Sequence, residues 1–330
     1  MTVEEGSAAG FPGGFGRAPG RTRRLLVGIA LAAACATASN RPPEINAQRT
    51  NVITPGRPVW HDLVTSDLAA AKRFYGGLFG WTFHEFDVRE GRYALASLGG
   101  MPVGGILQPA AREVNVSQWV TYFSVEDVDA ATRTGTGAGA RVVVPPRDIA
   151  KQGRAALLVD PQGAPVALAR LSGGDPAAAP PPLNGWLWVD LWSPDPKASA
   201  AFYQTLLGLD AELLDRPGVP YAVLGRDGRA YAGMLRIPQP DIRPNWLPIV
   251  RVESARAAAA RAEELGGRVI LAPRPEVREG RVAIVADPSG GAVAVHEWDV
   301  LQAQPPSARL LPSPAPRGEG SPGTSAEDRP

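Results

Sequence analysis

The sequence predicts an α+β protein made of two tandem domains, each built from a pair of βαβββ modules. Two observations carry this prediction: the halves of the chain repeat each other, and the order strand–helix–three strands occurs twice within each half. A length of 330 residues suggests about two domains. A hydrophobic content of 44% is sufficient for packed cores.

The repeat is visible as matched segments at a nearly constant separation. Trp60-His61-Asp62-Leu63 reappears 128 positions later as Trp188-Val189-Asp190-Leu191, and Phe74-Tyr75 reappears as Phe202-Tyr203. Further along, at a separation of 127 positions, Asp160-Pro161 reappears as Asp287-Pro288. We infer two homologous domains, over residues 57–171 and 184–299.

Each element follows from local patterning. Residues 58–64 alternate as a strand does, and Ser66 and Asp67 offer a cap for a helix over 66–79 with apolar residues at helical spacing. The remaining elements of the first domain are expected as strands near 81–88, 92–98, 101–108 and 118–125, a helix from Asp127, and strands near 141–144, 154–159 and 164–170. The second domain repeats this order, with a helix over 254–265 that begins at Ser254 and stops at Gly266-Gly267.

The N-terminus reads as an export signal. Arg21-Thr22-Arg23-Arg24 precedes an apolar run over 25–34, which is too short to span a bilayer, and Cys35 follows directly. The last residues of this run with Cys35 resemble a bacterial lipobox. We expect residues 1–40 to be a lipoprotein signal and a disordered N-terminus, residues 41–56 a tether, and Cys35 the lipidated anchor of a protein facing the periplasm or the cell exterior. The alternatives are a plain cleaved signal, or a cytoplasmic protein if the start codon is wrongly assigned.

Composition limits the other functions. Residues 172–183 are rich in Pro and Ala and predict a linker, and residues 300–330 predict a disordered tail. A formal charge of +1 argues against a nucleic-acid partner. The single cysteine excludes a disulfide framework and a cysteine-based zinc site.

Several motifs resemble the vicinal oxygen chelate superfamily, which includes glyoxalase I, bleomycin-resistance proteins and extradiol dioxygenases. These motifs are the turns Asp160-Pro161-Gln162-Gly163 and Asp287-Pro288-Ser289-Gly290, the helix segment 74–81 and the segment 125–131. The resemblance implies two curved sheets, each forming a cup with helices on its outer face. In both turns proline fixes φ and glycine accepts a positive φ, so the motif itself is structural. Gly104-Gly105 and Gly233 are expected to allow a close backbone approach or a bulge.

The resemblance also implies where metal-using members place their ligands, on the first, fourth, fifth and eighth strands of a domain. These places fall in the first domain at His61, Leu107 or Gln108, Val120 and Ala167. In the second domain they fall at Val189, Leu235 or Arg236, Leu247 and Ala294. A catalytic divalent site needs about three protein ligands. We therefore expect no metal and no other cofactor.

The family orientation would point His61 into the first cup and turn Trp60 and Asp62 toward the helix. Strand alternation adds Tyr122 and Ser124 to the first cup, and Arg251 and His296 to the second. We expect these five side chains, His61, Tyr122, Ser124, Arg251 and His296, to contact a ligand; each could instead be a structural or solvent-facing polar residue. Asp62 and Asp190 need hydrogen-bond partners if buried, and a tyrosine hydroxyl or a backbone N–H of the following helix would serve.

Three functions remain open. The first is a protein that binds a small organic molecule in apolar cups without a catalytic metal. The second is a lyase or dioxygenase with an unconventional site around His61 and Tyr122, and the third is a surface interaction module. A fused pair can satisfy its own packing, so we expect a monomer.

Overall fold

The computed structural model describes residue 45 and residues 49–110, 117–149, 151–214, 221–238 and 242–299. Cys35, the expected signal and the expected tail lie outside these residues. Among the described residues, no helix combines the length and the apolar character needed to cross a membrane.

The first domain follows the predicted order of elements. It contains β1 (Pro58–Val64), α1 (Leu68–Phe79), β2 (Thr82–Val88), β3 (Gly91–Leu98), β4 (Met101–Pro109), β5 (Gln118–Ser124), α2 (Val128–Gly137), β6 (Arg141–Ile149), β7 (Gly153–Val159) and β8 (Pro165–Leu171). The helix expected over 66–79 begins at Leu68 because Asp67, rather than Ser66, accepts the capping bond, from the backbone N–H of Ala70.

The second domain repeats this order. It contains β9 (Trp186–Ser193), α3 (Pro196–Leu207), β10 (Asp210–Leu214), β11 (Tyr221–Arg226), β12 (Arg229–Arg236), β13 (Asn245–Val252), α4 (Ala255–Glu264), β14 (Arg268–Leu271), the short 3-10 turn η1 (Arg278–Gly280), β15 (Val282–Ala286) and β16 (Ala292–Glu297). The hydroxyl of Ser254 caps α4 by accepting from the N–H of Ala257, as the sequence predicts.

Each domain forms one mixed eight-stranded sheet. The strand orders are β2-β3-β4-β1-β5-β8-β7-β6 and β10-β11-β12-β9-β13-β16-β15-β14. The first strands of the two modules are antiparallel neighbours at the centre, β1 beside β5 and β9 beside β13. The two βαβββ modules of a domain therefore join into a single curved sheet, and the predicted α+β class is confirmed.

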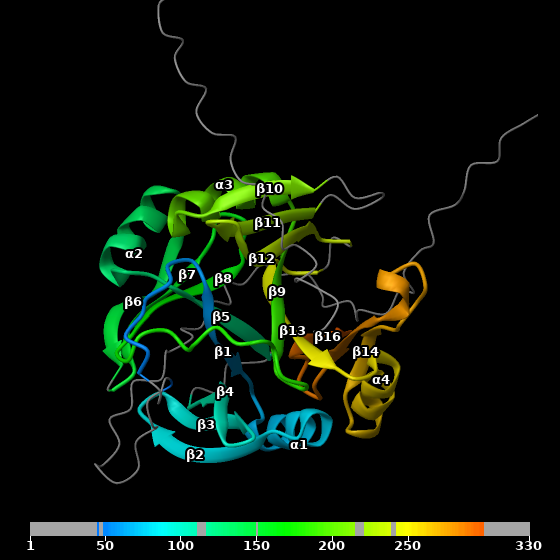
Figure 1. Cartoon of the computed structure of the whole chain (residues 1–330). Coiled ribbons are helices and arrows are strands. Elements are labelled where there is room, and N and C mark those ends of the chain that lie inside the picture. The colour runs from blue at the N-terminus through cyan, green and yellow to red at the C-terminus, as the bar shows by residue number, and fades with distance from the viewer. Residues whose placement is uncertain are drawn as a thin grey trace, which may run out of the picture.

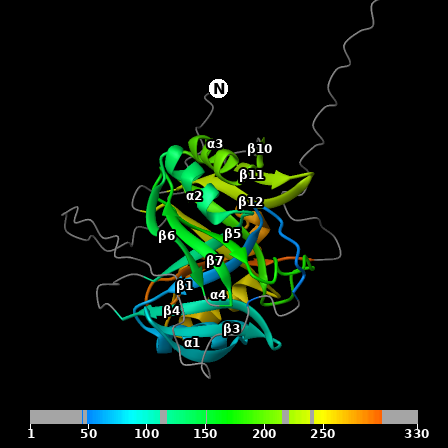
Figure 2. The ribbon, with the colours of Figure 1, turned by 90° about the vertical axis from the view of Figure 1, so that its left-hand side faces the viewer.

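The helices of one domain pack against those of the other. Figure 1 shows α1 beside α4 and α2 beside α3, and Figure 2 shows the same pairing from the side. Two large apolar clusters fill these contacts. One joins Phe74 of α1 to Val250 and Val295 of the second domain, and the other joins Phe123 to Leu206 and Trp246. The first module of each domain thus shares its core with the second module of the other.

Two matched hydrogen-bond chains cross between the domains. Trp119 donates its indole N–H to the hydroxyl of Tyr75, which donates to the carboxylate of Asp287. In the same way Trp246 donates to Tyr203, and Tyr203 donates to Asp160 at 2.9 Å. The two aspartates begin the Asp-Pro-x-Gly turns. Each turn therefore closes a hairpin in its own domain and also accepts a hydrogen bond from a tyrosine hydroxyl of the other domain.

Candidate ligand sites in the two cups and at the domain junction

The inner face of the first sheet, called here the first cup, is lined mostly by apolar side chains. It comprises residues of all eight strands, among them Val59, Trp60, Val64, Phe86, Val88, Tyr93, Leu95, Leu107, Val120, Tyr122, Val144, Ala155, Leu157, Ala167, Ala169 and Leu171. Ile45 packs against the same cluster. Tyr122 and Val120 face the first cup, as strand alternation predicts.

The expected orientation of β1 was wrong. Trp60 lies opposite Tyr122 and Asp62 opposite Val120 in the β1–β5 ladder, so Trp60 and Asp62 point into the first cup. Leu63 belongs to the cluster on the helical face, the same face as His61. Alternation separates the two faces of a strand but does not say which one is inside. A bulge between Pro58 and Trp60 further shifts the register at the start of this strand.

Asp62 is the centre of a hydrogen-bonded cluster in the first cup. Its Oδ2 accepts from the hydroxyl of Tyr122 at 2.7 Å, and its Oδ1 accepts from the hydroxyl of Tyr93 at 2.9 Å and from Nε1 of Trp60 at 2.8 Å. Burial raises the pKa of the Asp62 carboxyl, and the bonds from Tyr122, Trp60 and Tyr93 act in the opposite direction. Three donors and no acceptor suit a carboxylate, which can only accept.

The second cup repeats most of this cluster around Asp190. Tyr221 donates its hydroxyl to Asp190 at 2.6 Å, and Trp188 donates Nε1 to the same oxygen at 2.9 Å. The position of Tyr122 is taken here by Ile249, which lines the second cup with Leu247 and Ala294. Asp190 therefore lacks the second tyrosine donor that Asp62 has in Tyr122.

The other expected ligand residues all make contacts within the protein. Ser124 is buried and donates its hydroxyl to Asp175 of the linker at 2.9 Å. Arg251 donates to the carbonyl oxygens of Trp298 and Pro181, at 2.9 and 3.0 Å, and so anchors both ends of the second domain. His296 is buried beside Trp298, and burial, with Arg278 and Arg281 nearby, lowers its pKa to about 3.

The residues at the expected metal positions do not fit a chelated divalent ion. The first-strand position that faces the cup is Trp60 or Asp62, while Leu107, Val120 and Ala167 also face inward. Of these, only Asp62 could coordinate a metal, and both of its oxygens already accept hydrogen bonds. Among the residues that the structure describes, no group of three His, Cys, Asp or Glu side chains could hold a metal ion.

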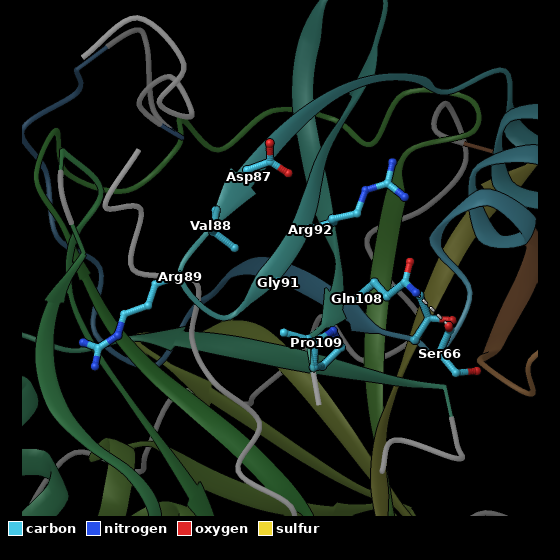
Figure 3. Close-up of a pocket in the computed structure, with 10 residues that line it drawn as sticks. Ser66, Asp87, Val88, Arg89, Gly91, Arg92, Gln108 and Pro109 are labelled. Carbon is cyan, nitrogen blue, oxygen red and sulfur yellow. Dashed lines mark hydrogen bonds between the residues drawn. The ribbon is translucent and has the colours of Figure 1, made fainter. Parts of the chain in front are cut away.

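A pocket of about 600 Å³ lies at the rim of the first cup, where β1 and β4 end and the β2–β3 turn begins. Figure 3 shows Val88, Gly91 and Pro109 around it, with Arg89 and Arg92 extending from the turn and the following strand. Gln108 donates to the carbonyl of Ser66 and accepts from the N–H of Leu68, which fixes the wall below α1. This pocket is open, charged at its edge and apolar where Val88 reaches the first cup. We call it the rim pocket.

His61 faces a different space, a pocket of about 540 Å³ between β1, β9, β12 and the linker. We call it the junction pocket. The His61 side chain is 5% exposed, its Nδ1 lies 3.1 Å from Oγ1 of Thr121, and its ring lies 4.5 Å from that of Trp186. Burial lowers the pKa of His61 to about 3, so the ring is neutral at physiological pH. The structure thus separates His61 from Tyr122, which the sequence placed in one cup.

The comparisons with known proteins agree with this architecture. Residues 57–168 and 185–295 each match the model of the Glyoxalase/Bleomycin resistance protein/Dioxygenase superfamily, and the chain belongs to that family. A "Putative glyoxylase CFP32" of Mycobacterium tuberculosis is 34% identical over 245 residues, covering 73% of this chain and 94% of the relative. The "Anthracycline biosynthesis protein DauV" of a Streptomyces species is 33% identical over 261 residues, covering 74% and 94%.

Solved structures share the fold at low identity. The Mn(II)-bound glyoxalase from Novosphingobium aromaticivorans aligns with a TM-score of 0.52 at 16% identity, covering 74% of this chain and 83% of that one. The 2,3-dioxygenase LapB from Pseudomonas sp. KL28 aligns with a TM-score of 0.53 at 14% identity, covering 75% and 94%. These similarities support the fold alone.

The sequence predicts a tyrosine hydroxyl as one possible partner for a buried Asp62, but it does not predict that the Asp62 cluster lies inside the cup. A signal for it exists, because Trp-x-Asp and a later tyrosine recur together in both domains, as Trp60, Asp62 and Tyr93 and as Trp188, Asp190 and Tyr221. Retention of all three residue types at one spacing indicates that they act as a unit.

Proposed function

We propose that the protein binds a small organic molecule at the first cup without a catalytic metal. The observation that carries the proposal is the inner surface of that cup, where Leu107, Val120 and Ala167 occupy expected ligand positions. The rim pocket supports it, since about 600 Å³ lies within the usual range for small-molecule sites. The lining of the rim pocket is mostly polar, and Val88, Pro109 and Ala110 are its apolar side chains.

The relatives' names are consistent with an organic ligand of modest size. One group is named after a glyoxylase and another after anthracycline biosynthesis. We carry over from these names only the class of small organic compound. No residue arrangement described above combines a nucleophile with a base, so binding rather than turnover is the proposed activity.

Elemental analysis of protein purified without chelators tests the proposal that no catalytic metal is bound. We expect less than about 0.1 equivalent of Mn, Fe, Ni or Zn per chain. Stoichiometric amounts of any of them, or metal-dependent turnover of a bound compound, would replace this proposal by a lyase or dioxygenase.

A ligand screen, followed by binding measurements on one variant, tests whether the ligand binds at the rim pocket of the first cup. A compound that binds at the first cup should bind the Arg89→Met variant differently, because Arg89 is exposed at the rim pocket and its removal should leave the fold intact. Arg133→Met, an equally exposed change on α2, is the matched control. Hits that respond to both changes alike would argue against the rim pocket.

We further propose export and lipid anchoring through Cys35, which lies outside the described residues. Replacing Cys35 by Ser should abolish lipid labelling and move the protein from the membrane fraction to the soluble fraction. Unlabelled wild-type protein in the cytosol would reject this proposal.

A further inference from the structure

The junction pocket is a further concave space between the domains, and it shares Val59 with the first cup and Trp188 with the second. It is bounded by the start of β1, the start of β9, the β11–β12 turn and linker residues 176–179 and 181. Both strands carry a register shift here, between Pro58 and Trp60 in β1 and between Trp186 and Trp188 in β9. A bulge re-aims side chains. In both strands the irregularity falls at the same position of the repeat, beside this pocket.

Polar groups without partners converge on this pocket. Nε of Arg57 is fully buried and has no hydrogen-bond partner among the residues that the structure describes, although Nη2 of the same side chain donates to the carbonyl of Pro176. Among the described residues, no partner is found for Nε2 of His61 or for the hydroxyl of Tyr231. Arg57 lines the pocket, and a bound anion could pair with its guanidinium group.

The charge of the lining is one-sided. Arg57 and Arg229 line the pocket, and no acidic side chain of the described residues does. The charge of Arg57 acts on the carboxylate of Asp175, and this carboxylate also accepts bonds from Ser124 and from the N–H of Thr54. An anion is therefore the complementary ligand, and a carboxylate matches a guanidinium edge.

The walls are aromatic. Trp186 and Trp188 both line the pocket, and their indole N–H groups are already engaged, by the carbonyl of Val103 and by Asp190. Only ring faces and edges remain to contact a ligand. Such surfaces favour a flat ring system.

We propose that the junction pocket is a binding site for a planar aromatic carboxylate. The carboxylate pairs with the guanidinium of Arg57, the ring lies against the tryptophans, and His61 and Tyr231 offer further polar contacts. The volume of about 540 Å³ is large enough for one such molecule. The site is independent of the first cup and of the function proposed there.

Isothermal titration of the purified chain with 2-naphthoate tests this site. We expect one molecule per chain, and at least about tenfold weaker binding of the neutral analogue naphthalene-2-carboxamide. Arg57→Met should weaken naphthoate binding at least about tenfold and remove the preference for the acid. His61→Val should weaken it severalfold, with folding retained because Val189 occupies the matching position of the second domain.

Two further variants keep the test decisive. Ala178→Trp fills the pocket from the linker and leaves both arginines in place, so it should block binding even if Arg57→Met fails to fold. Arg89→Met at the rim pocket should leave naphthoate binding unchanged. No binding by the wild type would overturn the inference. Binding that Arg89→Met abolishes and Ala178→Trp leaves intact would also overturn it, and would support the first-cup proposal instead.

Discussion

A single histidine shows how burial changes the chemistry of a residue. His61 is held away from solvent between Thr121 and Trp186, and burial lowers its pKa to about 3 from an ordinary value of 6.5. A neutral imidazole has one donor and one acceptor nitrogen, so His61 can form a hydrogen bond with a ligand without adding a charge to the pocket.

This histidine should make the protein sensitive to acid. Between pH 6.5 and about 3 the unfolded state takes up a proton at His61 that the folded state does not, so the free energy of unfolding falls as the pH falls. His61→Val should reduce this slope by up to about 1.4 kcal/mol per pH unit. Urea unfolding at a series of pH values measures it. The exposed His84→Val variant is the control for loss of a histidine; equal slopes in all three proteins would show that His61 is accessible to protons.

Gly105 is a second residue whose role depends on its surroundings. An added Cβ would lie 1.9 Å from the hydroxyl of Tyr93 and 2.3 Å from Oδ1 of Asp62, and Gly233 meets the equivalent groups in the second domain. The expected close approach is confirmed, and the structure shows what approaches: the Asp62 cluster itself.

Gly105→Ala should therefore destabilise the protein by about 1–3 kcal/mol, the scale of strain in a packed interior. Gly137→Ala, at the end of α2, is the contrasting change, because a Cβ there meets nothing within 4 Å. This control should be neutral or stabilise by up to about 1 kcal/mol. Denaturant titration of both variants makes the comparison, and a neutral Gly105→Ala would mean that the Asp62 cluster rearranges easily.

At the scale of elements, the sequence predicts most helix and strand boundaries, but it does not predict which face of β1 points into the first cup. The caps Asp67 and Ser254 and the glycines after α1 and α4 are local signals, and local physics fixed those helix ends. The inner face of β1 depends on its pairing with β5 and on the bulge after Pro58, which are non-local. For the same reason the sequence placed Tyr122 in a cup correctly but could not place His61.

The α1 and α3 helices each contribute a tyrosine that bonds across the domain boundary. Tyr75→Phe and Tyr203→Phe should each cost about 1–2 kcal/mol, because Asp287 or Asp160 loses a donor and a tryptophan N–H loses its acceptor. The two losses in the free energy of unfolding should add in the double variant, since the two hydrogen-bond chains share no residue. Equilibrium unfolding of the three variants tests this. Strong non-additivity would show that the two contacts are coupled through the domain interface.

At the scale of the whole molecule, the two domains should unfold together. Both large clusters contain residues of both domains, so neither sheet keeps its outer face covered without the other. We expect a single urea transition, with tryptophan fluorescence and far-UV circular dichroism coinciding. Two separated transitions would contradict the shared core.

The same pairing supports our proposal that the chain is a monomer. Each domain covers in the other the surface that would otherwise need a second subunit. Light scattering after gel filtration should give the mass of one chain, and a stable dimer would reject the proposal.

The shared core also orders events during synthesis. Phe74 and Tyr75 are made early, yet their cluster includes Val293 and Val295 near the end of the second sheet. At typical elongation rates, on the order of ten seconds separates completion of the first sheet from that of the second. Throughout that interval the nascent first half carries an apolar surface that has no lasting partner, so a folding chaperone has its natural target on the α1 side of the emerging chain.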